Sequence, residues 1–270
     1  MILTEARNPA TMHLDQMTPL EIVRIMNKEN ANSVASLEAV LPQVAEAVEV
    51  ITAAFAKGGR LIYIGAGTSG RLAVVDAAEC PPTFGVPQEQ VVGICAGGIK
   101  TLISASENKE DDPDEGIEEL KSRNLCPEDV VVGISASGGA AYVCNAISYA
   151  KALGCATVSI SSNPGSRLSS LAHISIAPDT GAEVLTGSTR LKAGNAQKMI
   201  LNMLTTAAMV RSGYVYENLM INLKPTNIKL RGRVIRIVQE ITGYGEEEAI
   251  ALLEQGNWVI RDALRIWKEQ

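Results

Sequence analysis

Five short apolar runs, separated by stretches with helical character, constrain the fold of this chain more than any other feature. They cover residues 61–64, 90–95, 130–134, 156–160 and 174–177. Each run is apolar throughout instead of alternating between apolar and polar, which is typical of strands buried on both faces. The pattern predicts an α/β fold, a doubly wound parallel sheet flanked by helices.

The chain divides into three parts around this sheet. Residues 1–57 are expected to begin as an extended arm and to continue as helices that pack on the sheet domain or on a partner subunit. Residues 58–225 hold the five strands and form the main domain. Residues 226–270 follow a change in composition, and the glycine-bounded apolar stretches there predict a small appendage of three helices.

Local signals predict several helix boundaries. Thr18-Pro19-Leu20-Glu21 is a capping box with proline in the first turn, which predicts a helix running to about Lys28. Residues 34–51 carry an apolar seam that predicts a second helix packed along another one. Pro81-Pro82 is expected to end the helix after the first strand. Residues 187–210 should contain a helix that is apolar nearly all round in its later part, and so buried in the core or in a subunit interface.

The composition excludes several classes of protein. The net charge of −6 and the isoelectric point near 5.2, with scattered basic residues, predict neither a nucleic-acid partner nor a membrane surface. The N-terminus lacks the features of a secretion signal, and no apolar run of about 18 residues is present. The five cysteines lack disulfide-framework or metal spacing. We therefore predict a cytoplasmic protein with reduced thiols.

A glycine-rich turn after the first strand can bind a phosphate. Gly65-Ala-Gly-Thr-Ser-Gly70 fits the G-x-G-x-x-G pattern of dinucleotide sites, but the second strand ends in Cys95-Ala-Gly-Gly, without the carboxylate that such sites need. No Gly-Lys-Ser/Thr follows, which excludes a P-loop. Glycine amides at a helix start, beside the Thr68 and Ser69 hydroxyls, suit a compact phosphate monoester. A turn that serves packing alone is the alternative.

Acid–base chemistry must come from carboxylates. His13 lies in the arm and His173 precedes a strand, and neither pairs with a nucleophile. No metal-ligand spacing occurs. The candidates are Glu79 one helix after the glycine turn, the acidic run 107–115, and Glu183 before the long helix. In isolation Glu79 and the acidic run are more typical of solvated surface.

Three motifs resemble those of a known family. They are Gly65-Ala-Gly-Thr-Ser-Gly-Arg-Leu72, Asp76-Ala-Ala-Glu-Cys-Pro-Pro-Thr-Phe-Gly85 and Gly187-Ser-Thr-Arg-Leu-Lys-Ala-Gly-Asn-Ala-Gln-Lys198. They are similar to motifs of the N-acetylmuramic acid 6-phosphate etherases, which have a sugar isomerase (SIS) fold. The likeness extends from Thr4-Glu5 to Glu217-Asn-Leu-Met220. The glucokinase regulatory protein is related to this family.

The resemblance implies a lyase, without cofactor or metal, that converts N-acetylmuramic acid 6-phosphate to N-acetylglucosamine 6-phosphate and D-lactate in cell-wall sugar recycling. The sugar ring opens, a base takes the proton at carbon 2, lactate leaves from carbon 3 and water adds. The family's acid falls on Glu79, and its second catalytic glutamate falls on Glu110. The resemblance also implies a homodimer whose sites are shared between subunits.

We expect the phosphosugar to be bound near the carboxyl ends of the strands. One strand end departs from the family, whose members typically read Ala-Ser-Gly-Arg-Thr-Pro-Tyr-Val where this chain has Ala136-Ser-Gly-Gly-Ala-Ala-Tyr-Val143. The segment Gly139-Ala140-Ala141 therefore lacks an arginine and a threonine hydroxyl. The expected substrate-binding residues are Gly67, Thr68, Ser69, Ser135, Ser137, Glu183 and Lys192.

Two other functions are compatible with these residues. A non-catalytic sugar-phosphate sensor, like the glucokinase regulatory protein, would use the same pocket to change its affinity for a protein partner. A phosphosugar isomerase with Glu183 as its base would share the fold and the proton chemistry. Residues 246–263 resemble a ubiquitin-associated-type helical bundle, which we interpret as structural.

Overall fold

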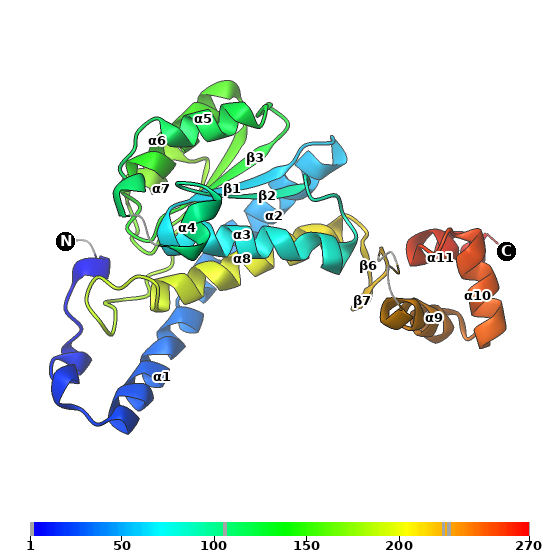
Figure 1. The fold of residues 1–270 in the computed structure, drawn as a ribbon, viewed down its shortest axis with the longest axis horizontal. Helices are drawn as coiled ribbons and strands as arrows, with labels where there is room; N and C mark the ends of the chain where they lie inside the picture. The colour runs from blue at the N-terminus through cyan, green and yellow to red at the C-terminus, as the bar shows by residue number, and fades with distance from the viewer. Residues whose placement is uncertain (1–2, 105–106, 223–224, 226–227, 270) are drawn as a thin grey trace.

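The sheet predicted from the apolar runs is present (Figure 1). The computed structural model describes residues 3–104, 107–222, 225 and 228–269. Its main strands pair in parallel in the order β2-β1-β3-β4-β5, which confirms the α/β fold. The bounds are β1 Leu61–Gly65, β2 Val91–Cys95, β3 Val130–Ile134, β4 Ala156–Ile160 and β5 Ile174–Ile176.

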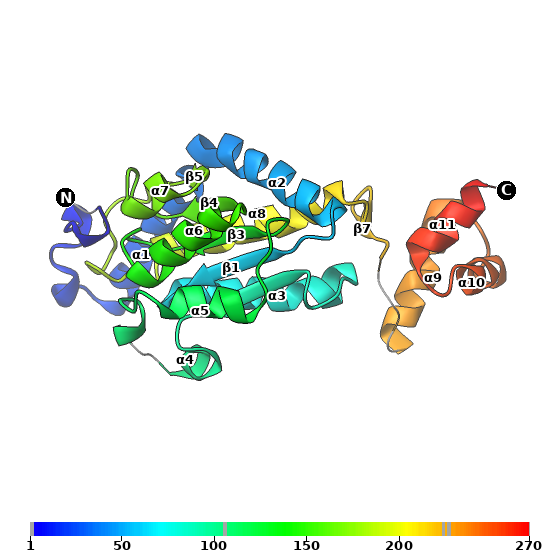
Figure 2. The same ribbon diagram turned by 90° about the horizontal axis from the view of Figure 1, so that it is seen from above.

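Helices cover both faces of the sheet (Figure 2). One layer consists of α2, α3 and α8, and the other of α5, α6 and α7. The α-helices are α1 Pro19–Ala35, α2 Leu41–Ala56, α3 Gly67–Phe84, α4 Ile99–Ile103, α5 Glu115–Ser122, α6 Ala141–Leu153, α7 Arg167–Leu171, α8 Lys192–Arg211, α9 Ile228–Thr242, α10 Glu246–Gln255 and α11 Ile260–Lys268. Short 3-10 turns are η1 Leu3–Glu5, η2 Pro9–Thr11, η3 Leu14–Gln16, η4 Glu38–Val40 and η5 Glu107–Lys109.

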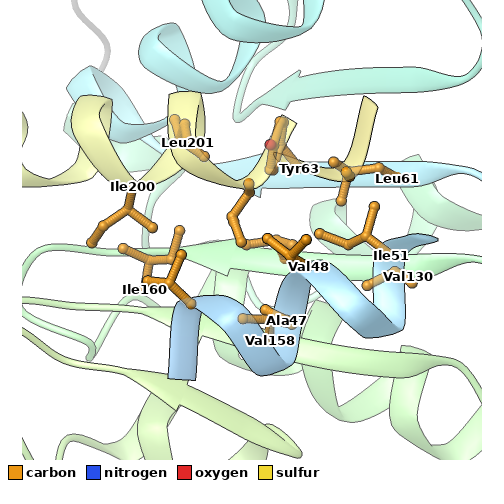
Figure 3. Close-up of a cluster of buried hydrophobic side chains, with 14 of the residues drawn as sticks. Ala47, Val48, Ile51, Leu61, Tyr63, Val130, Val158, Ile160, Ile200 and Leu201 are labelled. Atoms are coloured by element: carbon orange, nitrogen blue, oxygen red, sulfur yellow. The ribbon is translucent and has the colours of Figure 1, made fainter. Parts of the chain in front are cut away.

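The larger core lies between the sheet and the layer of α2 and α8 (Figure 3). Val48 and Ile51 of α2 meet Tyr63 and Val130 of the sheet in this cluster. Neighbouring strand residues such as Ile62 point to the opposite face, into the cluster beneath α5, α6 and α7. Both faces are thus apolar, which is why the strands read as continuous apolar runs.

The N-terminal helices differ from their predicted bounds. α1 extends to Ala35 instead of ending near Lys28, and the seam of residues 34–51 is not one helix, because η4 separates α1 from α2. Pro42 explains the break, since proline fits the first turn of α2, but in a continuous helix it could not donate to the Glu38 carbonyl and its ring would clash there. The stretch Pro19–Ala56 is apolar enough for a membrane span by length and composition alone, but α2 uses its apolar face in the core.

The N-terminal arm is folded instead of extended. It consists of the turns η1, η2 and η3, and it is bound to a loop far along its own chain. Asn8 Nδ2 donates to the Ala182 carbonyl at 3.2 Å, and Thr11 Oγ1 donates to the Val184 carbonyl at 2.9 Å. These hydrogen bonds fix the arm beside the loop that leads into α8.

Pro81 and Pro82 do not end α3, contrary to the prediction. The helix continues to Phe84 and ends at Gly85, which has the left-handed backbone (φ 65°) of a helix terminus. Phe84 is buried, and its carbonyl accepts a hydrogen bond from Asn222 Nδ2 at 2.9 Å. Packing of this last turn offsets the backbone hydrogen bonds that the two prolines cannot make.

α8 lies half in the core and half open. Ile200, Leu204 and Ala208 are fully buried against α2 and the sheet. The other side carries Met199, Asn202, Met203, Thr206 and Ala207, which line an open, largely apolar groove. The helix predicted to be apolar nearly all round therefore buries one side in this chain and leaves the other uncovered.

The last three helices lie together at the C-terminal end of the chain (Figure 1) and have a hydrophobic cluster of their own. Val234, Leu253 and Leu264, one from each of α9, α10 and α11, are buried together. The strands β6 Val215–Tyr216 and β7 Leu219–Met220 form a hairpin just before them, and Ile221 joins the same cluster. We propose that residues 226–270, together with this hairpin, form a small unit beside the sheet domain.

An ion pair between a half-buried arginine and a buried aspartate holds the starts of the two central strands together. Arg60 precedes β1 and Asp129 precedes β3, and the guanidinium contacts the Asp129 carboxylate at 2.6 Å. Backbone N–H groups of Arg60 and Cys126 also donate to this carboxylate, at 2.8 and 3.1 Å. Burial acts to raise the pKa of Asp129, but the Arg60 guanidinium and these amides outweigh it, so the pKa lies below its usual value.

We predict that Asp129→Ala lowers the free energy of unfolding by about 3 kcal/mol at pH 7, because it leaves Arg60 and two amides without their acceptor. A lowered carboxyl pKa stabilises the fold above about pH 4, and this contribution is lost as the pH falls through the folded-state value. The difference from wild type should therefore shrink in acid. Urea titrations at several pH values measure it, with exposed Glu46→Ala as the control; equal stabilities at pH 7 would contradict the prediction.

Candidate active site

A cavity of about 400 Å³ opens where β1 and β3 end and α3 begins. These strands are neighbours in the sheet, and their connecting helices lie on opposite faces. The cavity therefore lies at the topological switch point, where doubly wound folds bind ligands. It is lined by Glu5, Ala66, Gly67, Thr68, Ser69, Arg71, Glu110, Ile134, Ser135, Ala136, Ser137, Ala140, Gly187 and Thr189.

The glycine turn brings a helix start into this cavity. A Cβ atom at Gly70 would lie 2.5 Å from the Gly65 carbonyl oxygen and 2.7 Å from Cys95 Sγ, so only glycine lets α3 begin this close to the sheet. Gly67 has φ +54°, and no side chain caps the helix. The amides of this first turn lack intrahelical acceptors, which makes the helix start a site for an anion.

Hydroxyls from two strand ends surround the helix start. Thr68 and Ser69 lie in its first turn, and Ser69 Oγ donates to Gln197 Oε1 at 3.0 Å. Ser135 and Ser137 follow β3, and the Gly138 amide donates to Ser135 Oγ at 3.2 Å. The five residues predicted from the cradle and the third strand end, which are Gly67, Thr68, Ser69, Ser135 and Ser137, all line one cavity.

The segment after β3 that differs from the typical family sequence contributes to the cavity wall. Ala140 lines the cavity and precedes α6, which begins at Ala141. Where the family typically carries a longer side chain, this wall is a methyl group. A cationic side chain is nevertheless present, because Arg71 of α3 lines the cavity, and its Nε donates to the Thr101 carbonyl at 3.0 Å.

The two proposed catalytic glutamates lie in different places. Glu110 lines the cavity, and its carbonyl accepts a hydrogen bond from the Tyr142 amide at 3.1 Å, which ties this loop to α6. Glu79 is exposed on α3, twelve residues after Gly67, and does not line the cavity. At 1.5 Å per residue the separation is roughly 18 Å along the helix. Within one chain, the glycine turn and Glu79 do not share a cleft.

Glu183 and Lys192 have structural partners instead of lining the cavity. The Glu183 carboxylate is fully buried and accepts hydrogen bonds from the amides of Lys192 and Ala193, both at 3.0 Å. It therefore caps α8, where a negative charge is favourable. Lys192 is 1% exposed, and its Nζ contacts Glu29 Oε2 of α1 at 2.7 Å. These two residues hold the loop that carries Gly187 and Thr189.

Two charged residues of the cavity escaped the sequence analysis. Arg71 stands in the glycine motif but carried no predicted role, although its position one turn into α3 was a usable signal. Glu5 comes from the arm, whose contact with the 182–187 loop no local pattern reveals. The Gly187 amide donates to the Thr4 carbonyl at 3.2 Å, and a Cβ at Gly187 would lie 3.2 Å from Glu5 Oε2.

The fold and this cavity define a SIS-domain protein. The profile of the glucokinase regulatory protein N-terminal SIS domain matches residues 43–151, and the SIS domain profile matches residues 115–207. A phosphoheptose isomerase from Francisella tularensis is similar in structure, with a TM-score of 0.54, 16% identity and coverage of 71% of this chain and 98% of that one. The Vibrio vulnificus NanR protein complexed with ManNAc-6P has a TM-score of 0.52 at 16% identity, covering 74% and 67%.

Sequence relatives identify the family. The N-acetylmuramic acid 6-phosphate etherase of Cronobacter sakazakii is 51% identical over 263 residues, which cover 97% of this chain and 89% of the relative. The etherase of Pasteurella multocida is 51% identical over 256 residues, covering 95% and 85%. This chain belongs to the N-acetylmuramic acid 6-phosphate etherase family, a family of enzymes.

We predict that Glu183→Ala lowers the free energy of unfolding by about 2 kcal/mol, because two buried amides at the start of α8 lose their acceptor. Glu183→Gln keeps one acceptor oxygen and should cost less. Urea denaturation measures the stability, and calorimetric titration with N-acetylglucosamine 6-phosphate measures the affinity of the same variants. If Glu183→Gln abolished binding at unchanged stability, Glu183 would be a ligand contact and not a helix cap.

Proposed function

We propose that the chain cleaves the lactyl ether of N-acetylmuramic acid 6-phosphate, giving N-acetylglucosamine 6-phosphate and D-lactate. The observation that carries this proposal is the position of Glu110, a carboxylate in the cavity that also holds the anion-binding start of α3. Membership of the etherase family at about half identity supports the same substrate. We place the reaction in the cytoplasm, in the recycling of cell-wall amino sugars.

The residues of the cavity divide the work on the substrate. The phosphate lies on the first-turn amides of α3, with hydroxyls from Thr68, Ser135 and Ser137 around it. Arg71 adds the positive charge that an anionic substrate needs in an acidic protein. This anchoring fixes the open-chain sugar so that carbon 2 faces one carboxylate.

The chemistry requires one base and one acid. In the open-chain form the aldehyde at carbon 1 acidifies the proton at carbon 2, which Glu110 removes. The carbon 2–carbon 3 double bond forms as the ether oxygen leaves carbon 3, and Glu79 protonates that oxygen to release lactate. Water then adds at carbon 3 to give the product. Two glutamates in unlike surroundings suffice for this sequence.

We predict that Glu79→Gln and Glu110→Gln each lower the rate of lactate release by roughly 10²-fold or more, because each removes a proton-transfer group. Phosphosugar affinity should change little, since the cradle is intact. A coupled lactate assay and calorimetry measure the two quantities, with exposed Glu89→Gln as the control. Phosphosugar binding by the wild type without lactate would instead favour a sensor, and ketose product would favour an isomerase, although the fully buried Glu183 is poorly placed as its base.

Glu79 can reach a cavity if it comes from a second copy of the chain. Thr68, Leu72, Val75 and Glu79 fall at the spacing of one helix face on α3, and Val75 is 59% exposed. Leu72 and Met199 line the same surface hollow, beyond which the α8 groove continues. We propose a homodimer that covers this apolar surface and places Glu79 of one protomer at the cavity of its partner.

Mixing two inactive variants tests this arrangement. When Glu79→Gln and Glu110→Gln proteins are unfolded and refolded together, mixed dimers would contain one site with both glutamates. We expect about a quarter of the wild-type lactate activity, because random pairing makes half of the dimers mixed and one of their two sites intact. Each variant refolded alone is the control. A mixture as inactive as its components would show that the two glutamates do not act across subunits.

A further inference from the structure

Opening of the sugar ring needs proton transfers of its own. A cyclic phosphosugar has no aldehyde, so the proton at carbon 2 becomes acidic only after the bond between carbon 1 and the ring oxygen breaks. This step takes a proton from the hydroxyl at carbon 1 and delivers one to the ring oxygen. In the function proposed above, on which this inference rests, Glu110 and Glu79 act at carbons 2 and 3.

Few groups in the cavity can perform this transfer. Among its described lining residues, only the side chains of Glu5, Arg71 and Glu110 carry a formal charge. The Arg71 guanidinium has only donor groups and no acceptor for a proton. No histidine lines the cavity in the part of the chain that the structure describes. Glu5 is therefore the remaining candidate on this chain.

The surroundings of Glu5 favour this role. Thr4 is buried, and its carbonyl accepts from the Gly187 amide, so the backbone beside Glu5 is fixed to the opposite loop. The Glu5 carboxylate makes no hydrogen bond or ion pair with the described residues. It lies against Gly187, whose lack of a side chain leaves room for it. A positioned carboxylate without a protein partner is available to a ligand.

The charge of Glu5 sets which part of the substrate it meets. The phosphate on carbon 6 lies at the start of α3, and two anions repel each other at short range. Glu5 and Gly187 are contributed to the cavity lining by the arm and by the loop before α8, whereas Gly67 and Thr68 come from the start of α3. A carboxylate there accepts hydrogen bonds from the sugar hydroxyls at the end remote from the phosphate.

We propose that Glu5 catalyses ring opening. Its carboxylate takes the proton of the carbon 1 hydroxyl, the electron pair of that O–H bond forms the aldehyde double bond, and the bond from carbon 1 to the ring oxygen breaks. Glu5 then returns the proton to the ring oxygen. No atom or electron is gained or lost, and the carboxylate is regenerated for ring closure of the product.

Exchange between the two anomers of N-acetylglucosamine 6-phosphate tests the step separately from lactate release. The sugar, labelled with ¹³C at carbon 1, is mixed with full-length protein, and NMR exchange spectroscopy gives the rate above the buffer background. Wild type should accelerate the exchange, and Glu5→Gln should lower that acceleration by roughly 10²-fold with the sugar still bound. Glu89→Gln, at an exposed carboxylate outside the cavity, should keep it.

Controls separate ring opening from folding and from binding. Asp15→Asn removes another exposed carboxylate of the arm and should leave the exchange rate unchanged. Glu5→Asp keeps the carboxylate on a side chain that is one methylene shorter, and it should retain part of the exchange rate. The proposal would be overturned if Glu5→Gln accelerated the exchange as much as wild type does. It would also be overturned if that variant lost sugar binding and exchange to the same extent. A wild-type protein that accelerates exchange but releases no lactate would refute the etherase function and leave the role of Glu5 standing.

Discussion

The contact between Gly65 and Gly70 is the constraint on which the rest of this structure depends. A β-carbon at Gly70 would collide with the Gly65 carbonyl and with Cys95, so the first helix of the sheet domain begins directly against two strands. This puts the amides of the α3 start at the switch point between β1 and β3. The serines after β3 and the loop of Glu110 line the same cavity as that helix start.

The sequence predicts features that depend on neighbouring residues and misses those that depend on distant ones. The strands were predictable because burial on both faces makes each one apolar throughout. The cradle was predictable because its three glycines lie within one stretch of six residues. The sequence analysis expected Glu183 and Lys192 to bind substrate. In the structure Glu183 caps the start of α8, and Lys192 pairs with Glu29, which lies 163 residues away in the sequence. Helix α3 passes through Pro81-Pro82 because buried Phe84 and Asn222 hold its end, which local propensity does not show.

The position of Glu79 gives a reason for the shape of the apolar surface. α3 and α8 each bury one side in the core and leave the other side outside it, with Val75 exposed and Met203 half-buried. In the homodimer proposed above, this surface would lie beside Glu79, so that docking and chemistry would use the same helix. Beneath this surface, Asn202 Nδ2 of α8 donates to Asp76 Oδ1 of α3 at 2.6 Å, which keeps the two helices in register.

The attachment of the arm to the loop before α8 bears on how the chain folds. The hydrogen bond between Asn8 and Ala182 joins residues that are 174 positions apart in the sequence, and the one between Thr11 and Val184 joins residues 173 positions apart. Contacts of such sequence separation carry a large loop-closure entropy and form late. The arm is synthesised before the sheet but would thus find its place only after the loop with Ala182 and Val184 has been made, and a chain stalled before that point would be compact but without its full cavity.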